Sequence, residues 1–317
     1  MSYAQFGTVQ ATDFNTLVGG NPVTTSGTLN AVWATGGSTA GYGQTALANV
    51  TAGQTVASTG QWSTLVANTA SAATHQGSSI TAVTAPVAGG TITYLSAIPT
   101  NLTTIYTSRL NAATQGATSA NTVTTVATWS DKATWTQTVT FANGDAARYF
   151  FNSGGQLKIT MSHPAGTGIN LLLNNLASNV GTVVQSAPSS GSITVSGVLY
   201  NGITKVGGGG NAPTIGTNSG YYAMTTANAN VFYQTASTGP SGYLSTNINV
   251  FIKSNGTQGV NSDAGSVITI YTVWDEIPNG LTVATGSAVT VTAQAPETTN
   301  LANTWGTITL AGSVAVL

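Results

Sequence analysis

Histidine and acidic side chains are the residues of this sequence that could carry acid–base or nucleophilic chemistry, and they are scarce. The 317 residues include two histidines, His75 and His163, and seven acidic residues. A serine-hydrolase triad could combine His163 with Asp145. Either Ser153 or Ser162 would then supply the nucleophile. Because serines are frequent and no nucleophile-elbow pattern is present, this triad has little specificity, and we predict that His163 is an ordinary solvated loop histidine.

The acidic residues do not have the spacing of a glycosidase or of a metal site. Asp275 and Glu276 are adjacent, and neighbouring positions of a strand point to opposite faces, so the two carboxylates cannot converge on one glycosidic bond. With Asp263 they could offer oxygen ligands to calcium, but no ligand-loop spacing is present, and we predict that they cap turns. The sequence has no cysteine for a thiolate zinc site. We expect a non-enzymatic protein with no cofactor and no metal.

The composition indicates a surface that meets other proteins. Only 4% of the residues are charged and the formal net charge is −1, whereas about a quarter of the residues are charged in an ordinary soluble domain. A free monomer with so little charge is weakly protected against association. Hydrophobic residues make up 41% of the chain, with six tryptophans and eleven tyrosines, which favours packed cores over disorder. Six scattered basic residues cannot neutralise a phosphate backbone, so we expect no nucleic-acid partner.

Segments that direct a chain to a membrane are not evident in the sequence. Residues 1–7 have neither a basic start nor an apolar core of signal-peptide length. No apolar run approaches the roughly 20 residues that span a bilayer. We therefore expect synthesis in a cytoplasm, no export by a cleaved signal and no membrane partner.

Residues 1–118 predict a small helical domain for docking and assembly. Thr12–Val18 and Gly60–Val66 share one sequence pattern, in which an aromatic residue in the first turn of a predicted helix is followed by Leu and Val. The second of these helices is expected to continue to about Thr74. Apolar residues at three- and four-residue spacing predict the longest helix of this domain over residues 94–113.

The aromatic stretch Ala147–Phe151 predicts the first strand of a β-hairpin. Asn152–Gly155 contains residues that tolerate positive φ, so it predicts the turn. Gln156–Ser162 alternates apolar and polar residues and predicts the second strand. Upstream, the alternating stretch Thr134–Phe141 is expected to pair with the aromatic strand.

This hairpin lies in a middle segment, residues 119–187, which also contains a predicted link and a predicted helix. The polar residues 119–126 predict a connecting link. Leucine spacing over Gly168–Ala177 predicts a short helix, and extension of that helix to Val184 stays an alternative.

Residues 188–317 predict an antiparallel β-sandwich. Short alternating runs recur there between segments rich in Gly, Asn, Pro and Ser. Because the strands of residues 134–162 have no sheet of their own, we expect them to share a core with the C-terminal strands. The fold class is thus α+β and mainly β. The predicted C-terminal strands are Ile193–Leu199, Ala229–Gln234, Asn247–Lys253, Ser266–Trp274, Ala288–Gln294 and Trp305–Leu310.

Three stretches of the sequence carry a resemblance to a known family. They are Ala147–Gln156 (ARYFFNSGGQ), Thr28–Trp33 (TLNAVW) with Gly41–Gln44 (GYGQ), and Val267–Gly280 (VITIYTVWDEIPNG). They resemble segments of virion structural proteins from tailed bacteriophages, including phages of cyanobacteria and other marine hosts. The resemblance implies a non-enzymatic virion component, assembled in the host cytoplasm, and it brings no catalytic residues to carry over.

Together these observations predict a structural virion protein that acts by multi-copy assembly. Its partners would be copies of itself and other virion proteins, on the tail or baseplate side of the particle. Head decoration is one alternative, and a tail fibre that binds host-surface glycans is another. Aromatic side chains would be the energetic centres of such contacts, whereas Trp62 is expected in the core. The candidate contact residues are Trp33, Tyr42, Tyr221 and Tyr222.

Overall fold

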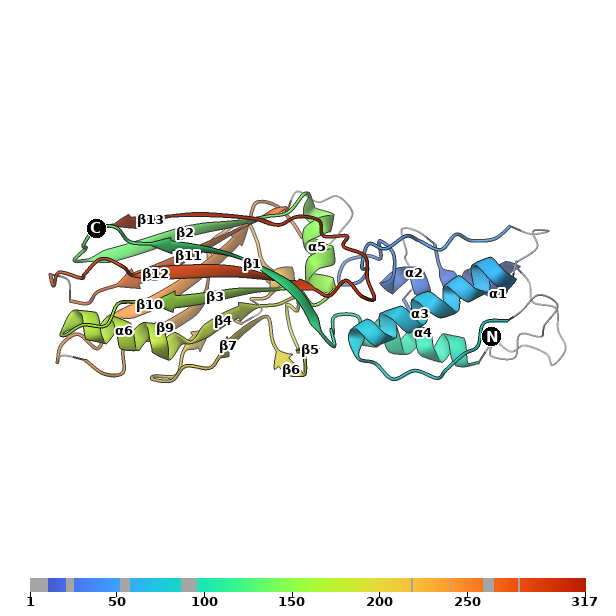
Figure 1. Cartoon of the computed structure of the whole chain (residues 1–317), viewed down its shortest axis with the longest axis horizontal. Coiled ribbons are helices and arrows are strands. Elements are labelled where there is room, and N and C mark those ends of the chain that lie inside the picture. Colours follow the sequence, from blue (N-terminus) through green and yellow to red (C-terminus); the bar gives the residue numbers. More distant parts are fainter. Residues whose placement is uncertain are drawn as a thin grey trace.

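The computed structural model describes residues 11–20, 26–51, 58–86, 96–217, 219–239, 241–258, 265–278 and 280–317. The molecule is elongated, with the N-terminal helices gathered at one end and the β-sheets at the other (Figure 1). The fold is α+β and mainly β, with an N-terminal helical domain followed by antiparallel sheets, as the sequence predicts.

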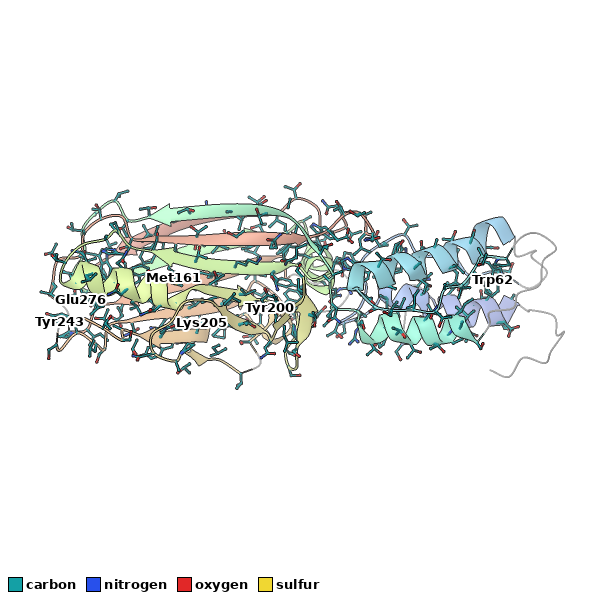
Figure 2. All side chains as sticks on the ribbon, turned by 60° about the horizontal axis from the view of Figure 1, so that its bottom comes forward. Trp62, Met161, Tyr200, Lys205, Tyr243 and Glu276 are labelled. Atoms are coloured by element: carbon teal, nitrogen blue, oxygen red, sulfur yellow. The ribbon has the colours of Figure 1, made fainter. Side chains whose placement is uncertain are left out.

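The helical domain has a hydrophobic core of its own, to which Phe14, Leu29, Trp62 and Leu102 belong. Trp62 lies among the helices (Figure 2), and its ring meets that of Phe14 edge-on with 5.1 Å between centroids. None of the described helices is both long and apolar enough to cross a bilayer. The helical elements are α1 (Ala11–Val18), α2 (Leu29–Val32), the π-helical turn η1 (Ser58–Trp62), α3 (Ser63–Gln76) and α4 (Ala97–Thr107).

Two of these helices follow the sequence-based expectations to different degrees. Helix α3 extends slightly beyond the predicted end and stops at Gly77, which has φ +68°. Helix α4 stops at Thr107, earlier than predicted, and just beyond its end Nη1 of Arg109 donates to the carbonyl oxygen of Tyr106 at 2.9 Å. Residues 94 and 95, where this helix was expected to begin, lie outside the described residues.

The β-domain consists of two antiparallel sheets that pack face to face, with a small separate hairpin. The five-stranded sheet has the order β1-β12-β3-β4-β7, and the six-stranded sheet has the order β13-β2-β11-β10-β9-β8. The strands are β1 (Gln115–Thr124), β2 (Lys132–Thr140), β3 (Gln156–Ser162), β4 (Thr182–Gln185), β5 (Ile193–Val195), β6 (Val198–Tyr200), β7 (Ile203–Val206), β8 (Thr214–Ile215), β9 (Ala229–Thr235), β10 (Asn247–Ser254), β11 (Val267–Asp275), β12 (Ala288–Pro296) and β13 (Thr309–Val316).

One core fills the space between the two sheets. Along β2 and β11 every second residue is buried, which is the period expected when one face of a strand meets a core. The rings of Trp135 and Trp274 lie 5.3 Å apart between centroids. Trp135 also donates from Nε1 to the carbonyl oxygen of Val123 in the opposite sheet, at 2.9 Å. The alternating pattern thus confirms the predicted antiparallel sandwich.

Both sheets combine strands from the middle segment with strands from the C-terminal segment. Strand β2 lies between β11 and β13, and β12 lies between β1 and β3. Residues 119–187 and 188–317 therefore build a common core, which confirms the prediction that these strands share one. The last strand begins at Thr309 instead of Trp305, because Asn303 forms a turn in which its Oδ1 accepts from the Gly306 amide at 2.8 Å.

The predicted hairpin strand Ala147–Phe151 is wrong, because this stretch is helical. Helix α5 (Gly144–Asn152) begins after Asn143, whose Oδ1 accepts from the Ala146 amide at 2.8 Å. Its buried residues Ala147, Phe150 and Phe151 have helical spacing, so one helix face enters the core. Strand β2, expected to pair with this stretch, pairs instead with β11 and β13.

The predicted polar link at residues 119–126 is also wrong, because residues 115–124 form the edge strand β1, paired with β12. Its polar threonine and asparagine side chains face mostly outward, which hides the alternation that marks a half-buried strand. The short helix is confirmed as α6 (Ile169–Val180). It does not extend to Val184, because Gly181 has φ +65° and the following residues join the sheet as β4.

Candidate functional site at the junction of the two domains

The two domains meet at a polar junction made by three segments. These are the loop Thr35–Gln44 of the helical domain, helix α5, and residues Glu297–Thr304, which follow β12 and return to the helical domain. Helix α5 lies at the end of the sandwich that faces the helices (Figure 1). The junction holds several of the charged side chains that this chain possesses.

Arg148 is the central residue of the junction. It is only 1% exposed, and its guanidinium crosses from α5 to the loop of the helical domain. Nη1 donates to the carbonyl oxygen of Ala40 at 2.7 Å, and Nη2 donates to that of Thr35 at 2.8 Å. Nε and Nη2 also donate to Oδ1 of Asp145, at 3.1 and 3.0 Å. The buried positive charge therefore has a carboxylate partner and satisfied donors, as a buried ion requires.

Neighbouring side chains extend this contact. Asn152 donates from Nδ2 to the carbonyl oxygen of Gly41 at 3.1 Å. The hydroxyl of Tyr222 lies 2.7 Å from Oδ1 of Asn152 and 2.7 Å from the carbonyl oxygen of Ser38, so its hydrogen can be donated to either acceptor. Gly43 has φ +71°, and a Cβ there would overlap the ring of Tyr149. The loop can approach α5 this closely because it has glycine at that position.

The segment after β12 fixes the opposite side of the junction. Glu297 pairs with His75 of α3, with 2.9 Å between Oε1 and Nδ1. Gln44 forms two bonds with Ala302: its Nε2 donates to the carbonyl oxygen, and its Oε1 accepts from the amide, each at 2.9 Å. Leu301 enters the hydrophobic core of the helical domain. The two domains are therefore joined by several buried contacts in addition to the chain connection.

The His75 hydrogen bond lowers the pKa of Glu297 to about 2, and donors at Asn300 and Thr299 act in the same direction against desolvation. A carboxyl group whose pKa is lower in the folded chain stabilises the fold above its ordinary pKa. This contribution is present at neutral pH and is lost as the pH falls from about 4.5 towards 2. Acid is therefore expected to loosen the junction.

Replacing this carboxylate with an amide, Glu297→Gln, is expected to remove that pH dependence. The variant should be less stable at pH 7 by about 2 to 3 kcal/mol, and the difference from the wild type should shrink as the pH falls to 2. Chemical denaturation at a series of pH values measures both effects. Asp275→Asn is the matched control, because Asp275 faces Lys132 across 3.9 Å at a half-exposed position. If the free energy of unfolding depended on pH equally in Glu297→Gln and in the wild type, Glu297 would not be the source of this pH dependence.

The aromatic residues predicted to contact other subunits lie mainly inside the chain. Tyr42 is fully buried, so the prediction of an external contact there is wrong; its hydroxyl donates to the carbonyl oxygen of Arg109 at 2.9 Å and accepts from Gln76 at 2.7 Å. Burial also raises the pKa of Tyr42. The glycine-rich sequence around Tyr42 suggested an exposed turn, but its glycines permit close packing.

The other three candidate contact residues are also buried or half-buried. Tyr221 is fully buried and stacks on Phe151 with 4.3 Å between ring centroids, which overturns an external role for it. Tyr222 is half-buried in the junction, where burial raises the pKa of its hydroxyl. Trp33 is 9% exposed and belongs to the core of the helical domain. Trp62 lies in that same core, as predicted.

The hypothetical catalytic residues do not come together. His163 is 4% exposed, so the solvated loop histidine is wrong. Its Nδ1 lies 2.8 Å from Oγ of Ser287 and its Nε2 lies 3.0 Å from Oδ1 of Asn170. Burial lowers the pKa of His163, which favours the neutral ring. Asp145 is instead engaged by Arg148, and Ser287 is itself fully buried, so this arrangement is a structural bond between α6 and the strand ends.

Of the acidic residues predicted to cap turns, Glu276 does so, whereas Asp275 ends β11 and faces Lys132. Glu276 is fully buried, and its Oε1 accepts from the amide of Leu281 at 3.0 Å. Burial raises its pKa. Glu276 lies at the end of the sandwich far from the helical domain (Figure 2). Within the described residues no three histidine or acidic side chains gather as a metal site would require, and Asp263 lies outside those residues.

Sequence reasoning missed the junction, although one signal for it was present. In a chain with so few ions, Arg148 stands three residues from Asp145, a spacing that pairs them on one helix face. The pairing of His75 with Glu297, 222 positions apart, had no local signal. Comparison of the chain with protein-family profiles, curated proteins and solved structures gave no significant match.

Proposed function

We propose that this chain is a non-enzymatic structural subunit of a tailed-phage virion, located on the tail or baseplate side and assembled in multiple copies. The observation that carries the proposal is the distribution of charge. The chain has six basic and seven acidic residues, and Arg148, Glu276 and Glu297 are buried. The exterior is therefore even poorer in ions than the composition alone implies.

Such an exterior suits contact with protein. Ions at an interface must lose their water, and this desolvation is costly unless each ion finds a partner. Surfaces of Thr, Asn, Ser, Gly and Ala avoid most of that cost. Several large apolar side chains are also exposed, including Val126 at 92%, Leu317 at 72% and Leu199 at 63%. The buried junction keeps the two domains in one orientation, which a repeating assembly needs. The resemblance of three stretches to phage structural proteins supports the same conclusion.

The proposal is tested on purified particles of the virus that encodes the chain. Mass spectrometry of density-purified virions should detect the protein at many copies per particle, and immunogold electron microscopy should label the tail or baseplate. Labelling of the head would favour head decoration instead. Absence of the protein from purified virions would refute the proposed function.

A glycan-binding tail fibre is the second candidate, and one observation favours it. An open hollow of about 460 Å³ lies where the loop after β4 meets β7 and β8, and hydroxyl, amide and backbone groups that suit sugar hydroxyls line much of it. The exposed aromatic platform that such a site would use is not supplied by Tyr221. Binding of host-surface glycans that Asn201→Ala abolishes would select this candidate. The lining residues include Ser189, Ser190, Asn201, Thr217 and Ser219.

A further inference from the structure

Strand β13 ends the six-stranded sheet and has a neighbour on one side only. It pairs with β2 from Thr309 opposite Thr140 to Val316 opposite Ala133, without a register shift. It lies along the margin of the sandwich (Figure 1). Within the described part of the chain, no hydrogen bond reaches residues 309–316 from the side away from β2.

The direction of the free backbone groups follows from one backbone hydrogen bond. The amide of Leu317 donates to the carbonyl oxygen of Lys132, so it points towards β2. Backbone groups alternate in direction along a strand. The amides and carbonyls of Leu310, Gly312, Val314 and Val316 therefore point away from β2, to the open side. They form a row of donors and acceptors along about 20 Å of strand.

The other sheet margins are short or are bonded to side chains of the opposite sheet. Strand β13 packs against β1 on its inner face, where Gly312 lies next to Val123 and Asn121, but within the described residues its backbone edge away from β2 forms no hydrogen bond. Strand β8 has two residues, and β7 has four with Lys205 among them. The edge strand β1 is covered by side chains of β2: Gln137 donates to the carbonyl oxygen of Asn121, and Trp135 donates to that of Val123. Monomeric proteins protect open edges with charged residues, proline or bulges. Strand β13, with the sequence TLAGSVAV, has none of these.

We propose that β13 pairs with β13 of a second copy of this chain, antiparallel about a two-fold axis, so that two six-stranded sheets become continuous. An open strand edge is completed by another strand, which identifies the kind of partner. A second copy fits because a two-fold axis places β13 of one copy opposite β13 of the other. Since β13 has no charged residue, this pairing brings no like charges together. Its outward side chains, Ala311, Ser313 and Ala315, are small and exposed. This inference rests on the proposed function only in requiring that copies assemble.

Charge placed on the open edge tests the pairing. Wild-type chain is expected to have a mass in solution of about 63 kDa, twice its 31.7 kDa, by light scattering after size exclusion. The double variant Ala311→Lys/Ser313→Lys should be monomeric, because the pairing would bring four lysines together. Thr103→Lys/Thr107→Lys is the matched control: it adds the same charge at exposed positions of α4 and should remain dimeric. Circular dichroism checks that each variant is folded.

Opposite charges provide a rescue that loss of folding could not imitate. Ala311→Glu/Ser313→Glu should also be monomeric alone, and mixing it with the lysine variant should restore a dimer. Hydrogen exchange adds a local measurement: the amides of Leu310, Gly312 and Val314 should be protected in the wild type and should exchange at least tenfold faster in the lysine variant.

Two results would overturn the inference. One is a wild-type chain that remains at 31.7 kDa at high concentration, which would leave the open edge to a different protein. The other is a dimer that persists in both edge variants, which would place the contact elsewhere. Neither result decides whether the protein is a virion component, because detection in purified particles tests that separately.

Discussion

Replacing Arg148 with methionine is expected to lower the free energy of unfolding by about 3 to 5 kcal/mol. The substitution keeps much of the apolar stem but removes a guanidinium that is 1% exposed. Asp145 would lose its cationic partner, and the carbonyl oxygens of Thr35 and Ala40 would lose their donors inside the junction. Unpaired buried polar groups retain their desolvation cost, and this is the source of the large effect.

Equilibrium denaturation in urea, followed by tryptophan fluorescence, measures this loss. Lys132→Met is the matched control, because it removes a cation whose distance to Asp275 is 3.9 Å and whose side chain is 39% exposed. Exposed pairs contribute about 1 kcal/mol or less, so the control should be nearly neutral. If both variants lost the same small amount of stability, Arg148 would not be the centre of the junction.

Replacing Phe151 with alanine is expected to cost about 3 to 5 kcal/mol as well, for a different reason. Phe151 is fully buried, stacks on Tyr221 and meets the ring of Phe150 edge-on with 5.0 Å between centroids. Alanine would leave a cavity where α5 packs against the sheets, and the surrounding rings cannot collapse to fill it.

Thermal unfolding and urea denaturation of Phe151→Ala should agree on the loss. Leu171→Ala provides the control, since Leu171 lies on α6 and is 46% exposed. Its substitution should change stability by less than about 0.5 kcal/mol. A near-neutral Phe151→Ala would contradict the helical assignment of α5, because it would mean that this ring does not face the core.

The sequence predicts those elements whose hydrophobic period is strong. Strands β10 and β11 alternate buried and half-buried residues along their length, and their predicted bounds agree closely with the structure. The leucine spacing of α6 identifies a helix because buried Leu172, Leu173 and Leu176 lie on one face. The sequence also predicts a shared core for the middle and C-terminal strands. The few strands predicted in the middle segment could not bury their apolar faces without further strands.

The failures arise where local preference and long-range packing disagree. Tyr149, Phe150 and Phe151 favour a strand by type, but the cap at Asn143 and burial of one face select a helix. Strand β1 reads as a link because its partner strand, β12, lies more than 160 residues away. Most of the junction could not be predicted, because its bonds join His75 to Glu297 and Gln44 to Ala302, and no local sequence pattern indicates a contact between residues so far apart in the chain.

The interleaved strand order has a consequence for synthesis on the ribosome. Strand β2 leaves the ribosome early, but both of its neighbours in the sheet, β11 and β13, are synthesised much later. Strand β1 likewise cannot pair until β12 has been synthesised. The hydrophobic core of the helical domain also needs a residue that is synthesised late, because it includes Leu301. Contacts of such long sequence separation slow folding, and unpaired strands are exposed meanwhile. The nascent chain thus cannot finish either domain until its last strands have left the exit tunnel, so incomplete translation products should be cleared by chaperones and proteases.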